Sequence, residues 1–213
     1  MRNLTVAAVA VTLAACNLAS AQVRGDGHAR TEARTVGAFS SVSAGVALHV
    51  TIRFGTPAAV TVTADANIVP LIRTRVQGDR LIVDSTGGFA PKTPVEVAIT
   101  VPSLTALEVS GASAAEAHGL AADAFAVEVS GASTARLDGT VAALTVEASG
   151  AGNLDAGRLA VTDATVAASG ASHVELRVAH GLTAAASGAA EIRYQGKPSV
   201  TRDVSGAASV KPR

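Results

Sequence analysis

Asp155 and Glu175 are the two residues of this sequence whose type and spacing best suit catalysis. Each stands six residues after the serine of a Ser-Gly-Ala triplet, at Ser149 and Ser169. If the triplets stack on neighbouring strands, the two carboxylates lie about 5 Å apart at the backbone. A pair of carboxyl groups about 5–5.5 Å apart is typical of a retaining glycoside hydrolase, in which one is the nucleophile and the other the acid.

A second column of carboxylates suggests a different chemistry. Three glutamates each precede a triplet by two residues: Glu108, Glu128 and Glu147. Stacked oxygen ligands of this kind could hold a hard cation such as Ca²⁺. The histidines His118, His173 and His180 take different places relative to their triplets and do not converge. We therefore expect neither a metal site nor a cofactor.

The column that contains Asp155 and Glu175 mixes positive and negative charges, which favours a structural interpretation. Its members are Glu116, Arg136, Asp155, Glu175, Arg193 and Lys211. On a solvated face such a column forms ion pairs from strand to strand, each contributing about 0–1 kcal/mol to stability. The repeated serines have no matching columns of histidine and aspartate, and the G-x-S-x-G, P-loop and H-E-x-x-H motifs are absent. The sequence predicts an exposed charge ladder and a protein that is not an enzyme.

An internal repeat of 18 to 20 residues must position these columns. The triplets begin at Ser110, Ser130, Ser149, Ser169, Ser187 and Ser205. The fifth residue after each serine is apolar and the sixth is charged, and this alternation with period 2 indicates strands. One repeat cannot bury its apolar side alone, so neighbours must stack. The sequence predicts an all-β fold, a right-handed parallel β-helix (solenoid) of about 18–20 residues per coil.

Residues 36–103 alternate more strongly but less regularly than the repeats. The residues Val46, Leu48, Val50 and Ile52 are expected on one face of a strand. We expect irregular, β-rich opening coils here, within a single β-helix domain at 36–211 that carries the Ser-Gly-Ala repeats at 104–211. Residues 22–35 are polar and lack apolar periodicity, which predicts a flexible lead-in.

The first 21 residues have the pattern of a Sec-type signal peptide. Arg2 precedes an apolar stretch from Leu4 to Ala15, and Ala19-Ser20-Ala21 is a cleavage site of the A-x-A type. An alternative is a lipobox at Leu13–Cys16, with a signal at residues 1–15 and a lipidated Cys16. We expect an exported protein under either interpretation.

Composition excludes several classes of protein. Lys+Arg and Asp+Glu each number 17, so there is no basic field for nucleic acid. No apolar run reaches the ~18 residues of a membrane span, so contact with a membrane is expected only through a lipid anchor. The single cysteine excludes a disulfide framework.

Several motifs together resemble a known family. They are Phe39–Ser43, Val50–Ile52, Asn67–Ile72, Thr100–Leu104, and Val-Ser-Gly-Ala-Ser at Val109–Ser113 and Val129–Ser133. Over residues 36–211 the chain resembles the putative auto-transporter adhesin, head GIN domain family. The resemblance implies an exported bacterial β-helix with an adhesive role. The stretch that names the family falls at Gly45-Val46-Ala47, where the third residue is not asparagine.

These observations favour a non-catalytic, exported envelope module that binds or adheres through a regular polar β-helix face. The alternative is a structural module, periplasmic or lipid-anchored, that binds an envelope partner, and a carbohydrate-active enzyme comes third. The expected ligand is a protein or polysaccharide of the envelope or surface, and the expected location is the periplasm, the outer membrane or the cell surface. A β-helix end could also join two copies of the chain. Charged residues near the last repeat oppose such edge pairing: Lys197, Arg202, Lys211 and Arg213.

Overall fold

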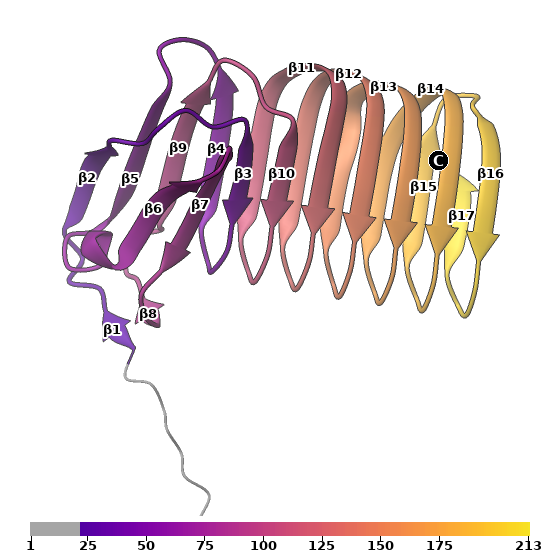
Figure 1. The fold of residues 1–213 in the computed structure, drawn as a ribbon. Coiled ribbons are helices and arrows are strands. Elements are labelled where there is room, and N and C mark those ends of the chain that lie inside the picture. Colours follow the sequence, from indigo (N-terminus) through magenta and orange to yellow (C-terminus); the bar gives the residue numbers. More distant parts are fainter. Residues whose placement is uncertain (1–21) are drawn as a thin grey trace, which may run out of the picture.

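The computed structural model describes residues 22–213 as an all-β, right-handed parallel solenoid of about five turns, joined to a less regular head (Figure 1). This confirms the fold class expected from the repeat. The predicted signal peptide and Cys16 lie outside the described residues.

Each regular coil consists of a tight turn, a strand on one face, a corner and a strand on the opposite face. The turn is the Ser-Gly-Ala triplet, and its glycine adopts a positive φ between 66° and 73° in all six copies. The amide of Ala132 donates to the carbonyl of Gly111 in the coil before (2.8 Å), and the later turns repeat this bond. Four long strands bend at the corner and so contribute to both faces: β11 (Ala114–Val129), β12 (Thr134–Ala148), β13 (Asn153–Ala168) and β14 (His173–Ala186).

The front sheet faces the reader in Figure 1, and its strands run β6-β7-β3-β10-β11-β12-β13-β14-β16. All neighbours in this sheet are parallel except β6 and β7. The bounds of the strands that belong to it alone are β6 Ile72–Gln77, β7 Arg80–Ser85, β3 Ser41–Ala44, β10 Ala106–Val109 and β16 Ser199–Val204.

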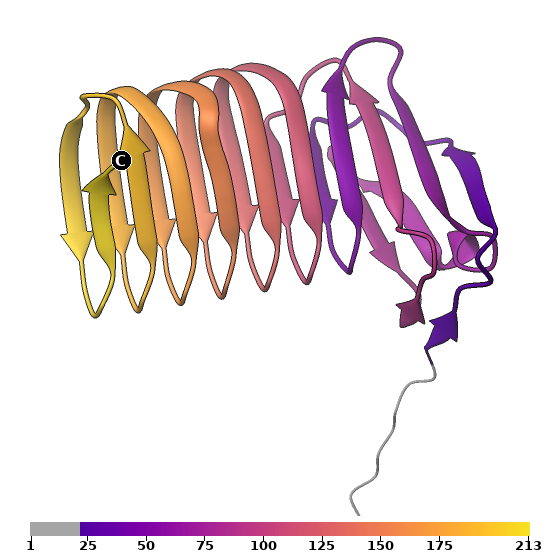
Figure 2. The same ribbon diagram turned by 180° about the vertical axis from the view of Figure 1, so that it is seen from behind.

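The back sheet faces the reader in Figure 2, and its strands run β2-β5-β9-β4-β11-β12-β13-β14-β15-β17. The pairs β2–β5 and β5–β9 are antiparallel and close the head. The bounds of the strands that belong to it alone are β2 Ala29–Arg34, β5 Ala59–Asp65, β9 Glu96–Val101, β4 His49–Phe54, β15 Glu191–Gln195 and β17 Ser209–Pro212.

The core lies between the two sheets and is filled by the inward columns of the repeat. The residues five after each serine are all buried, at 0–6% exposure: Ala115, Ala135, Leu154, Val174, Ile192 and Val210. In the head the core residues are larger, among them Ile52, Ile68, Ile72 and Ile99, and the 3-10 turn Val69–Leu71 lies beside them. The molecule therefore has a bulkier core in the head than in the alanine-rich stem.

Residues 22–35 are ordered by strand pairing, which differs from the flexible lead-in that their polarity predicts. Strand β1 (Val23–Arg24) pairs with β8 (Phe89–Ala90), and β2 pairs with β5 along its whole length. The strand β2 covers the edge of the back sheet through main-chain hydrogen bonds, and its side chains remain exposed or half-buried. An edge strand of this kind needs no apolar periodicity, and for this reason the sequence pattern missed it.

Val46 also departs from the sequence prediction. Leu48, Val50 and Ile52 are buried as expected, but Val46 lies in the turn before β4 with 36% of its surface exposed. Its φ is +73°, a conformation that β-branched residues rarely adopt. The strand begins only at His49, so the alternation did not extend back to Val46.

Within residues 22–213, no helix has the length and apolar character needed to cross a membrane.

Candidate functional site

The charge ladder forms a continuous row on the outer face of the back sheet. The pairing register places Glu116, Arg136, Asp155, Glu175, Arg193 and Lys211 opposite one another in that order. Arg136 Nη1 donates to Glu116 Oε1 at 3.1 Å, as a strand-to-strand ion pair requires. The strand register of the proposed ladder is therefore the one that the sequence predicts.

The other cations of the ladder bind a residue that the sequence analysis did not single out. Arg193 Nε lies 3.1 Å from Glu191 Oε1, and Lys211 also contacts the Glu191 carboxylate. The hydrogen bonds from Lys211 and Arg193 lower the pKa of Glu191 to about 2. Glu191 lies two residues before Arg193 on β15 and is therefore a diagonal neighbour of Lys211. A comparison within one column of the repeat does not reveal such a diagonal pair.

Asp155 and Glu175 lie opposite each other on β13 and β14, but both are already engaged. Asp155 accepts from the amide of Gly157 at 3.2 Å. Glu175 accepts from Gln195 Nε2 at 3.2 Å and from Arg213. Both carboxylates of this pair therefore accept hydrogen bonds from within the chain.

The histidines contact separate carboxylates of neighbouring coils. His118 Nδ1 lies 2.7 Å from Asp138 Oδ2, and its hydrogen bond is the main cause that lowers the pKa of Asp138. His173 lies 3.2 Å from Glu191, and His180 lies 2.8 Å from Asp163. Residues 22–213 contain no group of three His, Cys, Asp or Glu side chains placed to hold a metal ion.

Asp65 is a buried carboxylate in the head that sequence reasoning did not find. It is 0% exposed and accepts hydrogen bonds from the amides of Gly27, Lys92 and Thr93 and from the Thr93 hydroxyl, at 2.7 to 3.2 Å. Burial raises the pKa of Asp65, but these bonds together lower it by more, so the net pKa lies below its usual value. Asp65 thus joins the chain before β2 to the loop before β9.

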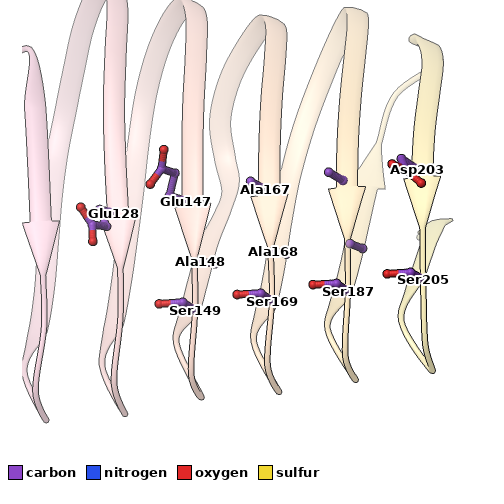
Figure 3. Close-up of a pocket in the computed structure, with 12 residues that line it drawn as sticks. Glu128, Glu147, Ala148, Ser149, Ala167, Ala168, Ser169, Ser187, Asp203 and Ser205 are labelled. Carbon is purple, nitrogen blue, oxygen red and sulfur yellow. The ribbon is translucent and has the colours of Figure 1, made fainter.

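A shallow hollow of about 290 Å³ lies on the outer face of the front sheet (Figure 3). The outward alanines Ala167 and Ala185 form its floor, because at this place in the repeat the earlier coils have glutamate and these two coils do not. Glu128 and Glu147 lie at one end and Asp203 at the other (Figure 3). The serines of four Ser-Gly-Ala triplets form a row along one margin: Ser149, Ser169, Ser187 and Ser205.

A second hollow of about 180 Å³ continues this depression toward the head. The two hollows share Glu128 and Glu147, and the second extends to Ser41 and Arg80. We call the two together the front groove, which crosses the strands from β3 and β7 to β16.

The glutamates of the front groove differ in how their charge is compensated. Glu108 pairs with Arg80 at 2.9 Å. Glu128 and Glu147 lie directly opposite each other on β11 and β12, are both exposed, and have no ion-pair partner within residues 22–213. Of the three stacked glutamates, only Glu108 is thus engaged by a cation of the described chain.

The chain matches a family model described as "Putative auto-transporter adhesin, head GIN domain" over residues 38–198. Several solved structures are similar to it. A putative adhesin from Bacteroides fragilis NCTC 9343 has a TM-score of 0.73 and 19% identity, over 90% of this chain and 100% of the other. A putative adhesin from Parabacteroides merdae ATCC 43184 has a TM-score of 0.57 and 17% identity, over 90% and 99%.

The third is a putative lipid binding protein from Parabacteroides distasonis ATCC 8503, with a TM-score of 0.54 and 14% identity over 91% and 100%. At these identities the similarity establishes a shared fold. No curated protein matches the chain.

Proposed function

Because the chain belongs to the putative auto-transporter adhesin, head GIN domain family, we propose that it is an exported, non-catalytic module that binds a partner of the cell envelope along its front groove. The front groove carries this proposal, because its two hollows adjoin at Glu128 and Glu147 and the larger has polar margins and an alanine floor. Concave surfaces with a few placed polar groups are the usual sites of ligand binding.

The side chains that could perform catalysis are better explained as structural. The ladder carboxylates Glu116 and Glu175 are paired with Arg136 and Arg213. The serines that line the front groove have no histidine within it to act as a base. Binding therefore accounts for this surface better than acyl or glycosyl transfer does.

Bulky substitutions in the front groove test the proposal. Ala167 and Ala185 are exposed and point outward, so A167W/A185W should fill the hollow without disturbing the core. We expect the native protein to co-sediment with isolated envelopes of its host and A167W/A185W to lose at least about tenfold in affinity. The matched control A142W/A179W changes exposed alanines outside the front groove and should bind as the native protein does. Equal binding by all three proteins would contradict the proposal.

The cellular location distinguishes an adhesin from a periplasmic module. Protease treatment of intact host cells should release peptides of residues 104–213 if the stem lies outside. Release only from ruptured cells would favour the structural periplasmic alternative. The intact mass of the mature protein would distinguish cleavage before Gln22 from lipidation of Cys16.

A further inference from the structure

We propose that the front groove takes an extended, positively charged polypeptide segment, whose lysine or arginine side chains meet Glu128 and Glu147. This inference depends on the proposed function, because it names the class of partner for the same groove.

The first argument is the placement of uncompensated charge. Several other acidic side chains of the stem have cationic or histidine partners, as Glu116 has Arg136 and Glu191 has Lys211. Glu128 and Glu147 face each other with no such partner within the described chain. Like charges directly opposite on neighbouring strands are destabilising. A ligand that carries positive charge would remove this repulsion when it binds.

The second argument is that no cation of the described residues lies on the front groove beyond Arg80. Arg80 is engaged by Glu108 at the head end. From β11 to β16 the charged residues that line the front groove are Glu128, Glu147 and Asp203, all acidic and all exposed. Every charge that lines the stem portion of the front groove is therefore negative, and the complementary ligand is positive.

The third argument separates a polypeptide from a polysaccharide. The front groove has no aromatic residue in its lining, whereas sugar rings are commonly bound on aromatic side chains. The floor of Ala167 and Ala185 leaves room for a main chain to approach closely. The hydroxyls of Ser149 and Ser169 on one margin can bond to peptide amides and carbonyls.

Fluorescence anisotropy with a labelled twelve-residue peptide of alternating lysine and alanine tests the inference. We expect saturable binding to the purified protein and a loss of about tenfold or more in E128Q/E147Q, with a weaker dependence on salt. The control D123N/E96Q removes the same charge from two exposed carboxylates outside the front groove and should retain native affinity. Equal losses in both variants would overturn the inference, since the peptide would then respond to net charge alone.

Two further probes and one comparison complete the test. Tighter binding of a chitosan oligomer, with the same loss in E128Q/E147Q, would assign the front groove to a cationic polysaccharide and overturn the polypeptide assignment. Displacement of the peptide by micromolar CaCl₂ would assign the glutamates to a cation instead. If A167W/A185W loses envelope binding while E128Q/E147Q retains it, the proposed function stands and this inference fails. If neither variant loses envelope binding, both fail.

Discussion

At the scale of single residues, Val46 shows what the solenoid requires of its turns. It occupies the place in the first turn that glycine occupies in the six later ones, since Ala44 pairs with Val109 and Val46 thus aligns with Gly111. A left-handed conformation costs an L-residue roughly 1–2 kcal/mol, and a glycine almost nothing. The exposed valine contributes little to the core in return.

We therefore expect V46G to raise the free energy of unfolding by about 1 kcal/mol, measured by chemical denaturation. The control V46A keeps an L-residue in the same left-handed conformation and should gain nothing. A V46A variant as stable as V46G would show that the valine side chain, and not its backbone conformation, is the source of the cost.

Glu191 gives a prediction about pH. Its pKa in the folded protein is about 2, below its usual value of 4.5, because Lys211 and Arg193 stabilise the carboxylate. A depressed pKa means that the stabilisation is complete above about pH 4.5 and disappears as the pH falls through 2. The difference in Tm between the native protein and E191Q should accordingly be largest above pH 4.5 and vanish near pH 2.

The matched control for this experiment is E96Q, which removes an exposed carboxylate that has no ion-pair partner within residues 22–213. Its Tm should follow that of the native protein across the same range. A constant offset between native protein and E191Q from pH 7 to 2 would mean that the charge of Glu191 contributes nothing.

At the scale of elements, the turn glycines limit how closely the coils can stack. Gly170 has a φ of +72°, and a Cβ there would lie 2.6 Å from the carbonyl oxygen of Gly150 in the coil before. G170A should therefore lower stability by about 2 kcal/mol, through the strained φ and the close approach together. The control G37A adds a methyl group where no atom lies within 4 Å and φ is not positive, and its effect should be small. A G170A variant as stable as G37A would show that the turns can separate without cost.

The elements of the stem could be predicted from the sequence because each coil repeats the same local pattern. Setting the serines of the triplets in register placed Ala115, Leu154 and Val174 in the core and Glu116 opposite Arg136, as observed. The head offered no such repeat to align. Strand β2 was missed because it pairs through its main chain, and Asp65 because its partners lie 27 to 38 residues away in the sequence.

The candidate site was only partly predictable, for a related reason. The ladder follows from column register, but the front groove depends on a break in a column, where Ala167 and Ala185 replace glutamate. Reactive residues can be recognised in a sequence by their type, whereas an alanine in place of a glutamate carries no such signal. The ion-pair partner of Glu108, on β10, is Arg80 on β7 of the head. No sequence repeat relates β7 to β10.

At the scale of the whole molecule, the stem is a stack in which each coil contacts mainly its two neighbours. The strand β13 pairs with β12 and β14, and its removal should let those two meet. Deletion of residues 150–169 joins Ser149 to Gly170 and so preserves a Ser-Gly-Ala-Ser turn. The new neighbours are compatible, because Arg136 would face Glu175 and Leu144 would face Leu182.

We expect this one-coil deletion to fold, with an unchanged β-type circular dichroism spectrum and a Tm lowered by roughly a few degrees, because stability in such a stack is close to a sum over coils and their interfaces. Deletion of residues 150–159 is the matched control, since it removes about half a coil. Residues 160–168, the greater part of which lies in the front sheet, would then directly follow Ser149 and take a place in the back sheet. Its inward columns would no longer meet the core of the next coil, and we expect it to aggregate. Equal tolerance of both deletions would show that the stem is not built from coils of this length, whereas failure of both would show that its coils do not act as independent units.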